Sequence, residues 1–164
     1  MFKKGDVVVY SASGVCEISE ISKKSFGSFS AEYYVLKPLM QKASTVFVPV
    51  QNEALTKKIH PILTQSEFEN IFTSLKNSAP ARLETENERR EKFSELLESG
   101  DRAALMLMVY DLNLHGKEQQ ECGRRLHIGD ERLLRTAENM LFEEVAYVFD
   151  LDIDAADEFI KSKF

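Results

Sequence analysis

The chain has 164 residues, of which 43% are hydrophobic and 29% are charged, as in an ordinary globular protein and unlike a disordered or fibrous one. This length allows one ordinary domain or two small ones. The net charge of −6 is unevenly spread, because residues 1–80 hold nine basic and seven acidic side chains whereas residues 81–164 hold twelve and twenty. Tight autonomous binding of nucleic acid needs a basic surplus for phosphate contacts, so the acidic half argues against it.

The sequence lacks the usual signals of export or membrane insertion. No apolar run reaches the roughly 18 residues that a membrane-spanning helix needs, and Met1–Asp6 lacks the apolar core of a secretory signal. We therefore expect a cytoplasmic protein that does not contact a membrane. Cys16 and Cys122 show no CxxC spacing, so neither a disulfide framework nor a zinc site is expected.

The first fifty residues predict short β-strands. Val7–Tyr10 is β-branched and aromatic, and Val15–Ile21 alternates so that Ile18 and Ile21 are expected on opposite faces. A turn is predicted over Ser25–Ser30, followed by two more strands, Tyr33–Leu36 and Thr45–Val50. Short strands without a long helix between them favour a small, strongly bent sheet or barrel, which should pack against the rest of the chain because it is marginally stable alone.

The pattern then becomes helical. Thr64–Glu67 and Thr85–Glu88 are capping boxes, in which a hydroxyl and a carboxylate satisfy the free amides of a first helical turn. Asn77–Pro80 interrupts the helical spacing and predicts a linker.

Three further helices are expected after the second capping box. Asp101 is placed to cap the first of them, which should stop near Gly116. A polar loop is predicted over residues 115–125, then a long helix over about residues 128–149 and one short helix within residues 150–164.

Several stretches together resemble the CarD-type transcription regulators, whose N-terminal module also occurs in the bacterial transcription-repair coupling factor. In the first half the similar stretches are Phe2–Tyr10, Ser13–Val15, Ile18–Ile21, Tyr33–Leu36 and Val46–Val50. In the second half they are Arg89, Leu96–Asp101 and Gly129–Leu134. Lys58–Leu63 departs from the family, which usually has a Gly-Leu-Arg segment there. The similarity is distributed over roughly residues 1–146.

The resemblance implies an α+β fold with two domains. A small Tudor-like β-barrel is expected over residues 1–63, a helix and linker over residues 64–80, and an all-helical, DNA-binding-like domain over residues 81–164. In such regulators the barrel binds the β subunit of RNA polymerase, and the helical domain contacts promoter DNA and favours the open complex. The resemblance thus implies these two partners. The acidic second half leads us to expect that DNA is bound weakly and only in the polymerase complex, and the sequence motifs predict neither a cofactor nor a small-molecule substrate.

A proline within a predicted strand points to the polymerase-binding edge. Pro49 cannot donate a ladder hydrogen bond, and proline in strands is mostly confined to sheet edges, which a partner strand can extend. The candidate polymerase-binding residues are Lys23, Lys24, Val46, Phe47, Val48 and Pro49. The alternative is that Pro49 merely ends the strand under a covering loop, and that Lys23 and Lys24 are solvated.

The DNA-binding half departs from the family at one position. Family members carry a tryptophan three residues before an arginine, and this tryptophan acts as a wedge in the minor groove. Here Arg89 matches the arginine, but the wedge position holds Glu86, whose carboxylate is repelled by phosphates and cannot stack. The candidate DNA-binding residues are Arg89, Arg90, Arg124, Arg125 and Arg132. The alternative is that these arginines form ion pairs within the domain.

The sequence offers no sign of an enzyme. Nucleotide-binding and nucleophile motifs are missing, and His60, His115 and His127 are scattered. The acidic run after residue 150 lacks the glycine and glutamate of a calcium loop. The favoured hypothesis is a transcription regulator that binds the polymerase β subunit and modulates open-complex stability. The alternative is an adaptor that binds polymerase but not DNA and acts through protein contacts of its acidic helical domain.

Overall fold

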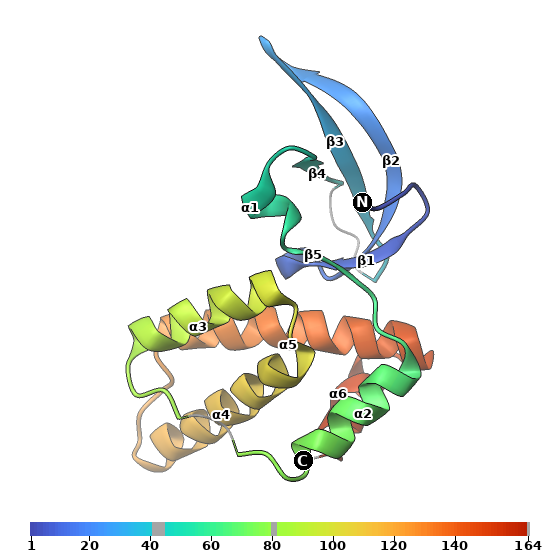
Figure 1. Cartoon of the computed structure of the whole chain (residues 1–164). Helices are drawn as coiled ribbons and strands as arrows, with labels where there is room; N and C mark the ends of the chain where they lie inside the picture. Colours follow the sequence, from blue (N-terminus) through green and yellow to red (C-terminus); the bar gives the residue numbers. More distant parts are fainter. Residues whose placement is uncertain (41–44, 80–81, 164) are drawn as a thin grey trace.

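The computed structural model describes residues 1–40, 45–79 and 82–163, and it confirms the α+β class. A strand-rich N-terminal half stands on a body of helices (Figure 1). The strands are β1 (Val7–Tyr10), β2 (Val15–Phe26), β3 (Phe29–Pro38), β4 (Val46–Pro49) and β5 (Ile59–Pro61), with a 3-10 turn η1 (Ser11–Ser13) and a short helix α1 (Glu53–Thr56).

The five strands form one open antiparallel sheet in the order β4-β3-β2-β1-β5. Because β4 and β5 lie at opposite edges, the strand pairing does not close into the expected barrel. The chain between these two short strands coils into α1, and Leu55 of α1 packs against the sheet's core. Through Leu55, α1 thus covers part of this core.

The hairpin of β2 and β3 is longer than predicted. The turn expected over Ser25–Ser30 is wrong, since only Gly27 and Ser28 separate the strands and Phe26 pairs with Phe29. Gly27 has φ +64°, and two-residue hairpin turns require such a backbone, which glycine adopts without strain. The hairpin therefore projects beyond the rest of the sheet (Figure 1).

The alternation predicted for β2 is wrong beyond Ile18, because a β-bulge interrupts it. The register between β2 and β3 shifts between Ile18 and Glu20. The inserted residue turns Ile21 to the same face as Ile18, where both contact the sheet's core, instead of to the opposite face. That core consists of Val8, Cys16, Ile18, Tyr34, Leu36, Val48 and Ile59.

The helical half contains α2 (Gln65–Leu75), α3 (Glu86–Ser99), α4 (Arg102–Glu121), α5 (Ile128–Phe149) and α6 (Ile153–Lys161). The capping boxes at Thr64 and Thr85 are confirmed, and Asp101 caps α4 by accepting the Ala104 N–H at 2.9 Å. Pro80 of the predicted linker, and Phe164 at the end, lie outside the described residues.

Helix α4 does not stop at Gly116 but continues to Glu121. An interior glycine costs only about 1 kcal/mol of helix stability, and the Lys, Glu and Gln residues that follow favour the helix. The predicted loop over residues 115–125 is therefore wrong in extent, because the connection to α5 comprises only residues 122–127.

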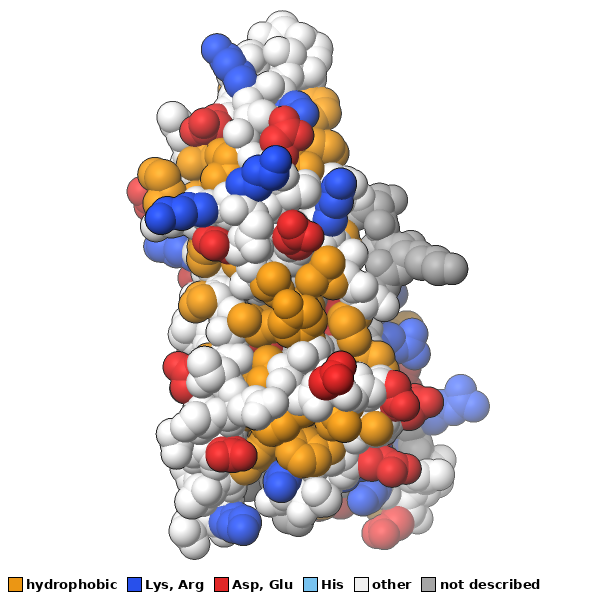
Figure 2. All heavy atoms as spheres, turned by 90° about the vertical axis from the view of Figure 1, so that its right-hand side faces the viewer, with side chains coloured by type: hydrophobic (Ala, Val, Ile, Leu, Met, Phe, Trp, Pro, Cys, Tyr) orange, Lys and Arg blue, Asp and Glu red, His pale blue; other side chains and the backbone are white. Residues whose placement is uncertain are grey.

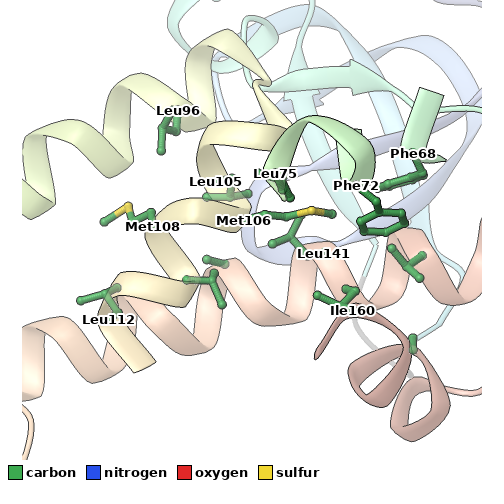
Figure 3. Packing of buried hydrophobic residues seen from close by; sticks show 14 of the residues in the cluster. Phe68, Phe72, Leu75, Leu96, Leu105, Met106, Met108, Leu112, Leu141 and Ile160 are labelled. Carbon is green, nitrogen blue, oxygen red and sulfur yellow. The ribbon is translucent and has the colours of Figure 1, made fainter. Parts of the chain in front are cut away.

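One apolar core holds the helices together (Figure 3). Helix α2 contributes Phe68, Phe72 and Leu75 to it, so α2 is part of the helical body. Phe149 and Phe159 pack edge-on and tilted against these rings, which ties α5 and α6 to α2. Among the helices of the described chain, none has the length and apolar character needed to cross a bilayer.

Candidate functional site

The sheet and the helices meet at a junction that combines apolar and polar contacts. Val9 and Val15 of the sheet are fully buried against Met140 of α5. Next to them the Glu143 carboxylate accepts the Val15 N–H at 3.0 Å. Gly14 allows this approach, because a Cβ at that position would lie 1.7 Å from Glu143 Oε2. The turn between β1 and β2 is thus fastened to α5 by a buried carboxylate.

A second buried carboxylate fastens the chain that leaves β5. Glu144 is 1% exposed and accepts two hydrogen bonds from Arg102, Nε to Oε2 at 2.8 Å and Nη2 to Oε1 at 3.1 Å. Glu144 also accepts the Leu63 N–H at 3.0 Å, and Arg102 Nη2 donates to the Pro61 carbonyl at 3.3 Å. A buried pair of this kind is fully hydrogen-bonded, so losing one partner is strongly destabilising.

These contacts fix the angle between the sheet and the helical body. His60 adds a further link, with Nε2 2.7 Å from the Leu97 carbonyl of α3. Burial lowers the pKa of His60, and Arg102 nearby lowers it further, so the neutral ring is favoured here. Burial, with the Glu143 carboxylate nearby, raises the pKa of Cys16 to about 12, so this thiol stays protonated. The junction is a structural support and not a reactive site.

The outer edge of β4 faces away from this junction. β4 pairs with β3 on one side only and contacts α1, whereas α5 meets the sheet mainly at η1, β1 and β2. The Val50 N–H donates to the Glu32 carbonyl at 2.9 Å. Because the N–H and C=O groups of successive residues in a strand point to opposite sides, those of Val48 point toward β3 and those of Phe47 point outward. Pro49 has no N–H, and its carbonyl accepts the Asn52 N–H at 3.0 Å. The open edge is therefore short and centred on Phe47.

Four aromatic side chains gather on the sheet face next to this edge. We call Phe26, Phe29, Tyr33 and Phe47 the aromatic patch. The ring centroids of Phe26 lie 5.4 Å from Tyr33 and 5.7 Å from Phe47, both edge-to-face. Phe26, Phe29 and Phe47 are 53%, 62% and 41% exposed. Exposed aromatic rings held in fixed orientations are typical of a protein-binding surface.

The predicted polymerase-binding residues differ in exposure and in the face of the sheet on which they lie. Val48 is fully buried and Val46 half-buried in the sheet's core, so neither side chain can anchor a partner. Lys23 is exposed opposite Glu32, on the other face from the aromatic patch. Lys24 lies on the face of the patch, with Nζ 3.2 Å from Glu20.

Sequence reasoning missed Phe26 and Phe29, because both fell within a predicted turn. The order Phe-Gly-Ser-Phe was the available signal, since a two-residue turn with glycine between apolar residues predicts a tight hairpin. In such a hairpin the two phenylalanines pair across the strands and share one face.

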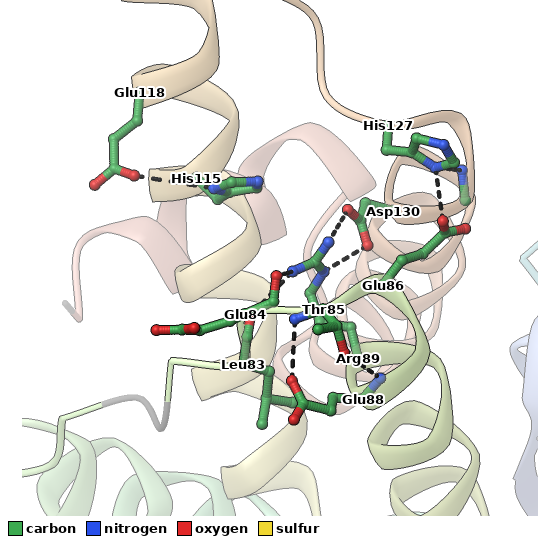
Figure 4. Close-up of polar contacts among 11 residues, drawn as sticks. Leu83, Glu84, Thr85, Glu86, Glu88, Arg89, His115, Glu118, His127 and Asp130 are labelled. Atoms are coloured by element: carbon green, nitrogen blue, oxygen red, sulfur yellow. Dashed lines mark hydrogen bonds and ion pairs between the residues drawn. The ribbon is translucent and has the colours of Figure 1, made fainter.

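Arg89 differs from the other arginines of the predicted DNA face, because it is buried (Figure 4). Its Nε and Nη2 donate to Asp130 at 2.7 and 2.6 Å, and its Nη1 donates to the carbonyls of Leu83 and Glu84. The hydrogen bonds to Asp130 raise the pKa of Arg89. All three guanidinium nitrogens donate hydrogen bonds within the domain. The prediction that Arg89 lies on a DNA-facing surface is therefore wrong, and Arg89 forms an ion pair within the domain, as the alternative predicted.

The remaining four predicted arginines are exposed. Arg90 lies on α3 near Asn87, Arg124 and Arg125 follow α4, and Arg132 lies on α5. The start of α3, the end of α4 and the start of α5 converge at one end of the helical body (Figure 1).

Glu86, at the expected wedge position, is the first residue of α3, and its side chain, 41% exposed, reaches toward the start of α5. Its Oε2 is 3.2 Å from Nδ1 of His127, and its Oε1 would be 2.2 Å from a Cβ on Gly129 (Figure 4). A carboxylate beside the first turn of a helix is favoured by the helix dipole. Glu86 therefore contacts the start of α5 at the surface of the protein.

Other surfaces and groups give no sign of chemistry. On the face shown in Figure 2, basic and acidic side chains are interspersed between apolar bands, so neither sign dominates there. Cys16 is buried and Cys122 exposed, and both are free thiols. Within the described ranges, no three His, Cys, Asp or Glu side chains are grouped so as to hold a metal.

Comparison with protein families assigns both halves of the chain. Residues 2–63 match the model of the CarD-like/TRCF RID domain, and residues 70–161 match the model of the CarD C-terminal domain. The first match covers the sheet with α1, and the second covers most of α2 and the helices that follow. The chain belongs to the CarD family of RNA polymerase-interacting transcription regulators.

Proposed function

We propose that this protein docks on the β subunit of RNA polymerase through the outer edge of β4 and the aromatic patch, and that its helical domain then contacts promoter DNA and stabilises the open complex. The observation that carries the proposal is the open edge at Phe47 beside exposed aromatic rings. A partner strand can pair with an open edge, and adjacent rings supply apolar contact and side-chain specificity.

The two lysines of the hairpin add little charge to the patch. Lys24 lies beside the rings and is held by Glu20, while Lys23 projects from the other face of the same strand. Because Lys24 is paired with Glu20 and Lys23 lies on the other face, apolar contact with the rings and pairing at the strand edge contribute more to the proposed docking than charge does. Phe47 is the best single anchor, since it contributes both an outward backbone and an exposed ring.

The rigid junction explains how weak DNA contacts can matter. Because Glu143 and Glu144 fasten the sheet to α5, docking of the sheet fixes the position of the helical body as well. A tethered surface meets its target at a high effective concentration, so even a poor DNA surface can lengthen the life of the open complex.

The docking part is tested by pull-down of the polymerase β subunit with the full chain. Phe26→Ser and Phe47→Ser should each reduce capture about tenfold or more, since each removes an exposed ring that the complex would bury. Leu114→Ser is the matched control, because Leu114 is 38% exposed on α4, away from the sheet. Equal capture by all three variants would refute docking through the patch.

An adaptor that does not bind DNA is the second candidate, favoured by a groove between α4, α5 and α6. The groove has a volume of about 560 Å³, and its apolar lining includes Val109, Leu114, Phe142 and Ile160. A side chain of a protein partner fits a groove of this size. The adaptor function predicts two results. Charge reversal of the exposed arginines should leave the lifetime of the polymerase–promoter complex unchanged, and Leu114→Ser should abolish the protein's effect on transcription.

A further inference from the structure

The outer edge of β4 presents its free backbone groups at a single residue of the strand. The N–H and C=O of Phe47 point away from β3, whereas the outward carbonyl of Pro49 already accepts the Asn52 N–H. Pro49 has no N–H to donate. The edge therefore offers a partner strand one donor and one acceptor, both on Phe47.

A donor and an acceptor on the same residue are complementary to a second copy of that residue. In antiparallel pairing, two directly opposite residues exchange both N–H···O=C hydrogen bonds, so Phe47 can face Phe47 of a second copy across a twofold axis. A shift of the register by two residues would place Phe47 opposite Pro49, which cannot donate in return. The proline thus favours the register that is centred on Phe47.

No charge on β4 opposes the approach of a second copy. Sheet edges are commonly protected against self-pairing by charged side chains, above all lysine, but Val46–Pro49 contains none. On the adjacent face, Lys24 Nζ lies 3.2 Å from Glu20, so this lysine is paired within its own copy. Pro49 limits the length of the ladder, which makes the contact between copies short and reversible.

Pairing across Phe47 also joins the two aromatic patches. A twofold axis perpendicular to the sheet keeps both patches on the same face, and directly opposite side chains lie about 5 Å apart. Phe47 then meets Phe47 of the second copy while its own ring is held edge-on by Phe26 and Tyr33. Helix α1 packs through Leu55 on the opposite face, beside Val48, so it does not cover the patch.

We propose that this protein forms a twofold dimer in which β4 pairs antiparallel with β4 of a second copy, and that dimerisation and binding to RNA polymerase exclude each other. The second half of this inference rests on the proposed function, because both partners need the outward backbone and the ring of Phe47. Dimerisation lowers the share of free edges as the protein concentration rises, and so limits how much of the protein can dock.

Sedimentation equilibrium of the full chain tests the dimer. The mass of the wild type should rise from 18.7 kDa toward twice that value with increasing concentration. Phe47→Ser should weaken the association about tenfold or more, since both copies lose a ring, whereas Leu114→Ser on α4 should match the wild type. A wild type that stays monomeric up to about 1 mM, or a dimer that Leu114→Ser but not Phe47→Ser disrupts, would overturn the inference.

Cross-linking tests the register. Phe47→Cys is made with Cys122→Ser, which removes the exposed thiol, while Cys16 is buried. A short bismaleimide should link Phe47→Cys to its second copy. Phe26→Cys is the matched control, since Phe26 also belongs to the exposed patch but lies on β2, about 24 Å from its counterpart across the axis. Equal cross-linking at both positions would refute the pairing centred on Phe47.

Adding the polymerase β subunit to the dimer separates failure of this inference from failure of the proposed function. The wild-type dimer should dissociate into one-to-one complexes with the β subunit. If the protein is monomeric but Phe47→Ser still reduces capture of the β subunit, the dimer is refuted and the docking stands. If the β subunit binds the intact dimer, the shared edge is refuted. If the dimer forms through Phe47 but the β subunit is not bound, the dimer stands and the docking part of the proposed function fails.

Discussion

The sheet–helix junction and the surface around the start of α5 both contain charged side chains, but they differ in how those charges are satisfied. At the junction Glu143 and Glu144 are buried, and Glu144 is matched by Arg102 and by backbone donors. Around the start of α5 the arginines are exposed and make no ion pair among the described residues; they are Arg124, Arg125, Arg132 and Arg135. Charges satisfied inside the protein fix its shape, whereas exposed, unsatisfied charges remain available for a partner.

The comparison also separates two ways of contacting a partner. The aromatic patch offers exposed rings beside a strand edge, which are typical of protein contacts, whereas the start of α5 offers the exposed arginines Arg124, Arg125, Arg132 and Arg135, which are typical of phosphate contacts. The junction lies between them, and its rigidity determines whether docking at one surface can position the other.

The largest effect is expected from removing a buried charge at the junction. Glu144→Ala leaves Arg102 buried without its carboxylate and the Leu63 N–H without its acceptor, so the free energy of unfolding should fall by about 3–5 kcal/mol. Chemical denaturation measures the loss. Glu118→Ala is the control, because it removes an exposed partner of Arg82 and should cost less than about 1 kcal/mol. Similar losses for both variants would contradict a structural role for the buried pair.

A smaller effect is expected at the turn that Glu143 holds. Gly14 and Gly123 both have a positive φ, +65° and +69°, but Gly14 also has ψ −142°, and a Cβ would clash with Glu143 only at Gly14. Gly123→Ala should cost about 1 kcal/mol, the strain of a left-handed backbone alone. Gly14→Ala should cost about 2 kcal/mol or more beyond that, since its φ and ψ suit only glycine and displaced Glu143 leaves the buried Val15 N–H unpaired. Thermal denaturation of the two variants compares them directly, and equal melting temperatures would show that Glu143 is not a tight contact.

The smallest expected effect is the pH dependence that His60 gives to the junction. Its folded-state pKa is lowered below the usual 6.5, so the unfolded chain binds the proton more readily. Stability is therefore complete above pH 6.5 and falls as the pH drops from there toward the folded-state pKa, by no more than about 1.4 kcal/mol per pH unit. His60→Gln keeps a donor for the Leu97 carbonyl, and it should make the free energy of unfolding less dependent on pH between pH 7 and pH 5. An unchanged slope in that variant would rule out His60 as the source.

Much of the helical half could be predicted from local signals. Thr64, Thr85 and Asp101 each satisfy amides within three residues, so the sequence specifies these helix starts without reference to the rest of the fold. The end of α4 could not be found this way, because the glycine at residue 116 is tolerated inside a helix that packs well.

The sheet was less predictable, since its geometry depends on pairing between distant strands. The bulge near Ile18 and the short turn at Gly27 change which side chains share a face, and neither is visible from alternation alone. The patch of Phe26, Phe29 and Phe47 follows from this register.

By itself, the amino-acid order of this protein determined the α+β class, the helix starts, the proline-marked strand and the resemblance to CarD regulators, because each depends on neighbouring residues or on similar runs of sequence. Which charged side chains pair and which stay exposed depends on the tertiary structure. Arg89 and Asp130 lie 41 residues apart and neutralise each other in the interior, while the arginines around the start of α5 remain outside. Charge pairing and burial depend on which side chains meet in space, and no local pattern specifies that.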